Sequence, residues 1–200
     1  MSAPTARAVV KRVPARASYD AESVHAVLDA SLMGHIGIVV DGQPFVIPML
    51  YGRDGNVVYL HGSVASRLLR SLAGGIEVCL TATLVDGLVL ARSAFHHSMN
   101  YRSVVVFGTA VSVEGDEKVH GLRCITEHVA PGRWDEARRP NDNELKVTKV
   151  LRLDIADASV KARTGDPIDD ADDLDLPVWA GVVPCSLVFG DPIPSADYDQ

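Results

Sequence analysis

The sequence predicts a mainly β protein with α decoration, in which the strands run antiparallel. Two observations predict this class. Apolar segments of strand length follow one another through the middle of the chain, and short Asp-Gly turns at 41–42 and 86–87 separate several of them. The few segments with helical periodicity lie at the ends of this run, which argues against a doubly wound α/β sheet. We therefore expect consecutive hairpins that form an antiparallel barrel.

The N-terminal half is expected to contain one helix, three strands and a second, short helix. Asp20 can cap the first helix, which Gly34 ends. Its apolar face holds Val24, Val27, Leu28 and Leu32. The strands are expected over 35–40, 45–51 and 57–61. The short helix over 66–72 stops at Gly74-Gly75.

The C-terminal half is again dominated by strand patterns. Strands are expected over 76–85, 88–93, 103–114, 151–162 and 182–189, with the first two joined by a turn at 86–87. A helix over 116–129 should bury Val119, Leu122 and Ile125, and another is expected around 143–150. The acidic segment 165–177 lacks the glycine and closing glutamate of a calcium loop, and we interpret it as a solvated loop.

Length and composition limit the class of protein. At 200 residues the chain is long enough for one large domain, and we expect an N-terminal arm over 1–18, a domain over 19–190 and a flexible tail over 191–200. The net charge of −7 argues against general nucleic-acid binding. The sequence contains no bilayer-spanning run and no signal-peptide core, so we expect a cytoplasmic protein without membrane association. Three widely separated cysteines indicate free thiols.

The segment 61–67 has the composition of a phosphate-binding loop. Small and hydroxyl residues, Ser63 and Ser66 among them, lead into the short helix over 66–72, which carries Arg67 in its first turn and Arg70 one turn later. Backbone amides, hydroxyls and a guanidinium can converge on an anion in such a loop. An ordinary capped surface helix with solvated arginines fits the same residues. The spacings of a Walker loop and of a Rossmann dinucleotide site are absent.

Four motifs give the chain a resemblance to a known family. The segments GQPFVIPMLY, GNVVYLHGSVASRLLRSL, VCLTATLVDGL and NYRSVVVFGTA resemble, in order and spacing, the pyridoxamine 5′-phosphate oxidase-related FMN-binding split barrels. The branch with nitroimidazole-reductase-like proteins is the most similar. The likeness runs from about Ser18 to Phe189. It implies a six-stranded, partly open barrel that forms a homodimer, with FMN bound in clefts that the two subunits share.

The resemblance also implies positions for the cofactor-binding residues. Pro48, Met49, Leu50 and Tyr51 match the strand beside the isoalloxazine, where main-chain groups can contact the pyrimidine edge and N5. The stretch that contacts the ribityl chain and phosphate matches His61, Gly62, Ser63, Ser66 and Arg67. The family often has two adjacent basic residues here, whereas this chain has Arg67-Leu68.

Two further positions follow from the resemblance. Ser103 stands where the oxidases have a flavin-contacting glutamine, and its shorter side chain puts that contact in doubt. Trp179 lies in a tract similar to the Trp-Gly-Gly segment of the family. It can stack near the flavin of the partner subunit or serve as a core tryptophan.

Histidines are the candidates for catalysis. His96 and His97 are adjacent, and on a strand they point to opposite faces, so they form no ready metal pair and we expect no metal site. One of them can hydrogen-bond substrate or donate a proton, as can His61, or the segment is a polar interface loop.

The leading hypothesis is an FMN-dependent oxidoreductase that reduces a small organic molecule by hydride transfer through N5, with NAD(P)H as a transient electron donor. Two alternatives stay open. One is a non-catalytic flavin-binding or redox-sensing module. The other is a split barrel that uses F420 or haem, for which His61, His96 or His97 would be the axial ligand.

Overall fold

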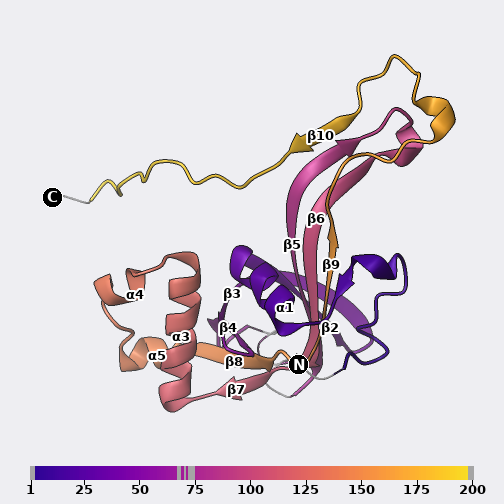
Figure 1. Cartoon of the computed structure of the whole chain (residues 1–200). Helices are drawn as coiled ribbons and strands as arrows, with labels where there is room; N and C mark the ends of the chain where they lie inside the picture. The colour runs from indigo at the N-terminus through magenta and orange to yellow at the C-terminus, as the bar shows by residue number, and fades with distance from the viewer. Residues whose placement is uncertain (1–2, 67–68, 70, 72–74, 198–200) are drawn as a thin grey trace. The chain divides into compact units, whose positions relative to one another are not determined.

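The chain is described here from a computed structural model that covers residues 3–66, 69, 71 and 75–197. These residues form two compact units (Figure 1). The first unit consists of Met1–Leu84 and Tyr101–Arg163, and the second of Val85–Asn100 and Thr164–Gln200. Within these described ranges, no helix is long and apolar enough to cross a membrane.

An antiparallel sheet is the main element of the fold, as the sequence predicted. The strands run in the order β1-β9-β6-β5-β2-β3-β4-β8-β7, and β10 pairs with β5. Their bounds are β1 Ala17–Ser18, β2 Met33–Val40, β3 Gln43–Asp54, β4 Val57–Ser63, β5 Glu77–Leu90, β6 Ser98–Thr109, β7 Val111–Val113, β8 Thr148–Asp154, β9 Asp157–Arg163 and β10 Gly181–Pro184. The described residues thus contain ten strands where the resemblance implied six. Three of the four additional strands, β1, β7 and β10, are pairings of only two to four residues that extend the sheet.

The α-helices all belong to the first unit (Figure 1). They are α1 Ala21–Ala30, α3 Gly115–Val129, α4 Arg133–Glu136 and α5 Asp142–Val147, with 3₁₀ turns at Pro14–Arg16, Ala94–His96 and Ala171–Asp173. Asp20 caps α1 by accepting from the amide of Ser23, as predicted. A capping box between Asn141 and Glu144 begins α5.

The β2–β3 hairpin was predicted correctly because its turn is local. Asp41 and Gly42 both adopt positive φ, at 50° and 76°, which is the geometry of a type I′ turn. β3 then connects two parts of the sheet. Its first eight residues pair with β2, and Tyr51–Asp54 pair with β4.

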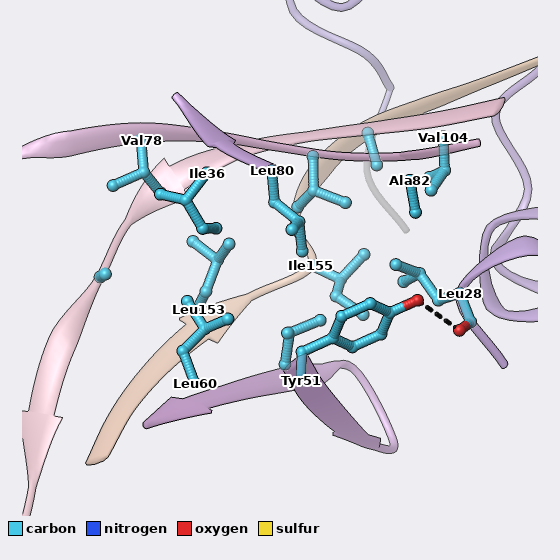
Figure 2. Close-up of a cluster of buried hydrophobic side chains, with 14 of the residues drawn as sticks. Leu28, Ile36, Tyr51, Leu60, Val78, Leu80, Ala82, Val104, Leu153 and Ile155 are labelled. Carbon is cyan, nitrogen blue, oxygen red and sulfur yellow. Dashed lines mark hydrogen bonds between the residues drawn. The ribbon is translucent and has the colours of Figure 1, made fainter. Parts of the chain in front are cut away.

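The core of the first unit lies between α1 and the inner face of the sheet (Figure 2). Leu28, Ile36, Leu60 and Leu80 are fully buried in it. Tyr51 is buried among them, and its hydroxyl donates to the carbonyls of Leu28 and Ser31 at 2.5 and 2.9 Å. Because a helix leaves its last carbonyls without intrahelical donors, this hydroxyl satisfies the end of α1.

The predicted turn at Asp86-Gly87 was wrong, since β5 runs through it without interruption. Gly87 pairs with Pro184 of β10, and a Cβ there would lie 2.8 Å from the side chain of Val182. The glycine therefore makes room for a neighbouring strand rather than for a turn.

Two further predictions in the C-terminal half were wrong. The predicted strand 151–162 is two separate strands, because Ile155 leaves the strand path and donates its amide to the carbonyl of Asn56 at 2.8 Å. β8 pairs with β4, whereas β9 pairs with β6. Val119 is exposed, since α3 is rotated so that Gly121 and Ile125 face the sheet.

The N-terminal segment packs on β9 of its own chain. Thr5 and Arg7 both bind the carboxylate of Asp157, and the Lys161 ammonium donates to the carbonyl of Arg12. The second unit is held by polar contacts. Its Asp169 accepts from the backbone and guanidinium of Arg92 at 2.7 and 2.9 Å.

Candidate cofactor site

The β3 residues that were assigned to the isoalloxazine alternate between two environments. Pro48 and Leu50 are exposed, and Met49 packs against the core. The Tyr51 side chain is fully buried and its hydroxyl is occupied, and burial raises the pKa of its phenol. A ligand beside this strand can therefore contact the side chains of Pro48 and Leu50 but not Tyr51, which has no exposed surface.

The strand also offers an apolar face and one open edge. Ile47–Leu50 pairs with β2 and with no other strand of the described segments. Exposed Met33 and Val46 extend the apolar surface around Leu50. An exposed apolar patch of this kind marks a binding surface, and the adjacent strand edge can supply hydrogen bonds. This combination suits a planar ring with a polar rim.

The loop after β4 holds its own shape through its serines. The amide of Ser66 donates to the carbonyl of Ser63 at 2.9 Å, and the amide of Ala65 donates to the Ser63 hydroxyl at 3.2 Å. The Ser66 hydroxyl accepts from the amide of Leu69 at 3.4 Å, as an N-cap does. Because both hydroxyls act as acceptors here, each keeps its proton available for donation to an anion.

The arginines of the predicted phosphate grip, Arg67 and Arg70, lie outside the described residues. The strand pairing nevertheless reveals a basic residue that sequence analysis missed. Lys149 of β8 pairs with Gly62 of β4. Because that register joins segments far apart in the chain, no local signal marked this lysine.

Gly62 has a packing role at the end of β4. A Cβ on it would lie 2.5 Å from the side chain of Leu69, which is itself buried. The glycine thus leaves room for the Leu69 side chain beside the strand.

His61 is the most unusual of the three candidate histidines. It lies near the end of β4, opposite Val150, and is half-buried. Its Nδ1 atom is buried and has no hydrogen-bond partner among the described residues. Burial lowers the pKa of the imidazole, so the neutral form is favoured. A neutral imidazole with an uncommitted nitrogen has the chemistry of a metal ligand.

His96 and His97 belong to the second unit, and both have partners. The Nε2 atom of His96 is 3.1 Å from a carboxylate oxygen of Asp170. The Nδ1 atom of His97 accepts from the amide of Ala91 at 3.2 Å. These contacts hold the segment between β5 and β6 and leave each ring with one nitrogen committed.

The remaining predicted residues, Ser103 and Trp179, differ in exposure. The Ser103 hydroxyl donates to the carbonyl of Lys161 at 3.2 Å, inside the β6–β9 pair. Trp179, in the second unit, is 64% exposed and lies against Gly181, where a Cβ would be 2.9 Å from the indole. Trp179 is therefore not a core tryptophan within the chain, and its contact with a flavin stays a prediction.

A cavity of about 620 Å³ lies at the turn end of the β2–β3 hairpin and was not predicted. Its lining includes Ile38, Phe45, Val78, Cys79 and Phe107, with Arg7 at one side. The Arg7 guanidinium lies 5.1 Å from the Phe107 ring centroid and binds Asp157 and Glu77 at 3.0 Å each. Since its charge is compensated, Arg7 is not an anion grip here.

The chain matches one protein family and is similar to several solved structures. The family model described as pyridoxamine 5′-phosphate oxidase matches residues 20–162. The flavocytochrome Anf3 from Azotobacter vinelandii is 41% identical, with a TM-score of 0.92, and the match covers 99% of this chain and 92% of that one. The FAD and haem binding protein from Mycobacterium smegmatis is 35% identical, with a TM-score of 0.89, over 92% and 91% of the two chains.

A third structure shows the fold alone. The putative 5-nitroimidazole antibiotic resistance protein from Bacteroides thetaiotaomicron is 23% identical, with a TM-score of 0.60, over 72% of this chain and 85% of that one. No protein with a curated description matches the chain.

Proposed function

We propose that this chain, which belongs to the pyridoxamine 5′-phosphate oxidase family, binds a flavin together with a haem and acts as an oxidoreductase. One observation carries the proposal. Two structures that match more than nine-tenths of the chain, at 41% and 35% identity, are a flavocytochrome and a protein that binds FAD and haem. The sequence led us to expect FMN. We now propose a flavin that is either FMN or FAD, and the second relative favours FAD.

The residues of the first unit fit a flavin. The apolar face with Pro48 and Leu50 suits the ring system, and the adjacent strand edge suits its polar rim. Ser63 and Ser66 have hydroxyl protons to donate to a phosphate, and Lys149 adds a positive charge beside the loop. The predicted homodimer would cover this exposed strand face and exclude water from the ring.

The donor set also fits a haem, through His61. Haem iron is often held by a neutral imidazole, and His61 is the one candidate with a buried nitrogen that lacks a partner in the described part of the chain. His96 and His97 each have a ring nitrogen engaged by a neighbour in the second unit. We therefore assign the axial-ligand role to His61.

When bound, a flavin supplies hydride chemistry and a haem supplies one-electron chemistry. The chain's own residues bind, orient and shield these groups. The apolar β3 face orients the ring and keeps water out, and the serine loop fixes the anionic end. Burial keeps the His61 imidazole neutral, and therefore able to ligate, at neutral pH.

The absorbance spectrum of the freshly purified full chain tests the proposal. We expect a flavin band and a Soret band together, and release of the flavin by denaturation identifies FAD or FMN by chromatography. Protein that takes up neither added flavin nor added haem would contradict the proposal. A protein that binds flavin but no haem would instead support the FMN-dependent reductase of a small organic molecule, with NAD(P)H as electron donor.

The ligand assignment is tested by three matched substitutions. His61→Ala should abolish the Soret band and leave the flavin band, whereas His96→Ala and His97→Ala should keep both. Loss of haem in one of the latter two, with haem retained in His61→Ala, would move the axial ligand to the second unit.

A further inference from the structure

The geometry points to a binding site for a zinc-like divalent cation, formed by Asp54 at the end of β3 and by His120 and Cys124 of α3. One oxygen, one nitrogen and one sulfur atom of these residues all lie within 4.8 Å of one another. The three side chains belong to the first unit, and none of them is a predicted cofactor residue. Sequence analysis missed the cluster because Asp54 is 66 residues from His120.

Both neighbours approach the same atom of His120. Its Nε2 lies 2.8 Å from an Asp54 carboxylate oxygen and 3.4 Å from the Cys124 sulfur. A carboxylate needs Nε2 to carry a proton, whereas a thiol donor needs it to offer a lone pair, so a neutral imidazole cannot satisfy both. A cation placed between the three atoms satisfies all of them, because each then donates a lone pair to it.

The shared nitrogen also argues against a catalytic triad. In a Cys-His-Asp triad the imidazole contacts the nucleophile through one nitrogen and the carboxylate through the other. Here one nitrogen faces both partners. The arrangement is therefore one of converging ligands rather than a proton relay.

The sulfur–nitrogen separation is that of a tetrahedral site. With a metal–sulfur bond of about 2.3 Å and metal–nitrogen and metal–oxygen bonds of about 2.0 Å, ligand atoms lie roughly 3.3–3.6 Å apart. The observed 3.4 Å between sulfur and nitrogen falls in this range, and a small outward shift of the exposed Asp54 carboxylate brings the oxygen into it.

The backbone fixes the two elements at this distance. His120 and Cys124 are four residues apart on α3, so they share one face of the helix. A Cβ on Gly52 would lie 2.3 Å from the carbonyl carbon of Cys124, which shows that α3 touches β3 directly. The His120 ring packs edge-on against Tyr59 at 5.7 Å between centroids, which orients the imidazole.

The charges suit a dication. A carboxylate, a thiolate and a neutral imidazole together carry two negative charges. The nearby Arg53 is committed to Asp29, with nitrogen–oxygen distances of 2.6 and 2.7 Å. A thiol ligates as the thiolate, so binding of the cation would release the Cys124 proton to solvent.

The fourth position belongs to water. The cluster opens into a cavity of about 370 Å³ that Glu127 and His128 also line. Glu127 accepts from the amides of Gly132 and Trp134 at 2.7 and 2.8 Å, and His128 contacts the carbonyl of Ser31 at 2.8 Å. Since both have other partners, three protein ligands and solvent complete the site. Sulfur and imidazole ligands select Zn²⁺ or Co²⁺ over Mg²⁺ and Ca²⁺.

The test uses the untagged full chain, equilibrated with Zn²⁺ by dialysis and analysed for metal content. We expect one Zn²⁺ per chain in the wild type and binding weaker by more than roughly tenfold in Cys124→Ser, His120→Ala and Asp54→Asn, since even outer-shell partners contribute that much. Cys79→Ser and His25→Ala, which change the same residue types elsewhere, should bind as the wild type does. Equal Zn²⁺ binding by the wild type and Cys124→Ser would overturn the site.

A second measurement needs no substitution and therefore does not depend on the folding of the variants. Zn²⁺ should slow alkylation of Cys124 and leave the rates at Cys79 and Cys185 unchanged, as followed by peptide mass analysis. Binding of Co²⁺ should add a thiolate charge-transfer band to the difference spectrum. Alkylation of Cys124 at the same rate with and without Zn²⁺ would exclude the sulfur ligand.

Discussion

The two compact units of this chain differ in how much apolar surface they bury. The first unit closes a hydrophobic core, in which Leu28, Leu60 and Leu80 are fully buried. The second unit buries few side chains among its described residues and leaves large apolar ones in solvent. Its exposed apolar residues include Phe95, Trp179, Leu187, Val188, Phe189 and Ile193.

The difference indicates which unit has a core that stabilises it without a partner. The core of the first unit supplies its own stability, because burial of apolar surface is the main favourable term in folding. The second unit depends on directed polar contacts such as Arg92 with Asp169. Its apolar surface is of the kind that proteins use for association. We infer that in the proposed homodimer a partner copy would cover apolar surface of the second unit as well as the exposed β3 face of the first.

The largest expected effect comes from truncating one leucine in each unit and comparing the two losses of stability. Leu60→Ala should lower the free energy of unfolding by about 2–5 kcal/mol, because it leaves a cavity in the core. Leu187→Ala removes a side chain of a residue that is 72% exposed, so the free energy of unfolding should change by less than about 0.5 kcal/mol. Urea titration measures both. A comparable loss in the two variants would mean that Leu187 is covered in solution.

A smaller effect is expected from the buried hydroxyl of the first unit. Tyr51→Phe leaves the carbonyls at the end of α1 without that donor and should lower the free energy of unfolding by about 1–3 kcal/mol. The same urea titration measures it. Tyr19→Phe, which removes a hydroxyl that accepts from Val10, is the matched control at the N-terminal segment. An unchanged midpoint for Tyr51→Phe would show that other donors satisfy α1.

The polar contact of the second unit should give a local rather than a global effect. Asp169→Asn weakens the contact with Arg92 and should speed proteolysis between residues 165 and 177, with Asp175→Asn as the exposed control. Burial acts to raise the pKa of Asp169, but hydrogen bonds from Arg92 outweigh it and hold the pKa below the usual value.

The lowered pKa of Asp169 also determines how the stability of this contact changes with pH. A carboxyl with a depressed pKa in the folded state stabilises above its ordinary pKa and loses this contribution as the pH falls through the lowered value. Proteolysis of the wild-type segment by an acid-tolerant protease should therefore rise below about pH 4. Asp169→Asn should lack this rise. An identical acid response in the two proteins would contradict the role of Asp169.

The smallest effect on stability is expected for Trp179→Ala. The side chain is 64% exposed, so the unfolding free energy of the isolated chain should change by less than about 0.5 kcal/mol. In the proposed homodimer the same change should weaken self-association, as measured by sedimentation equilibrium. Unaltered association would remove Trp179 from the interface.

Much of the fold could be predicted from local patterns. The cap at Asp20, the I′ turn at Asp41-Gly42 and the strands on both sides of it depend on residues close in sequence, and they were right. The ordered motifs predicted the family and the antiparallel fold class correctly. The turn predicted at Gly87 failed because a distant strand, β10, explains that glycine.

The sequence by itself determined the N-terminal hairpin of β2 and β3, and it predicted a phosphate loop over 61–67. Only the tertiary structure decided which distant residues meet there and elsewhere. Lys149 stands beside Gly62, Asp169 is buried against Arg92, and Asp54 joins two residues of α3. The physical reason is that turns and caps depend on neighbours in the chain, whereas these contacts depend on the register of paired strands and on the close approach of a helix to a glycine.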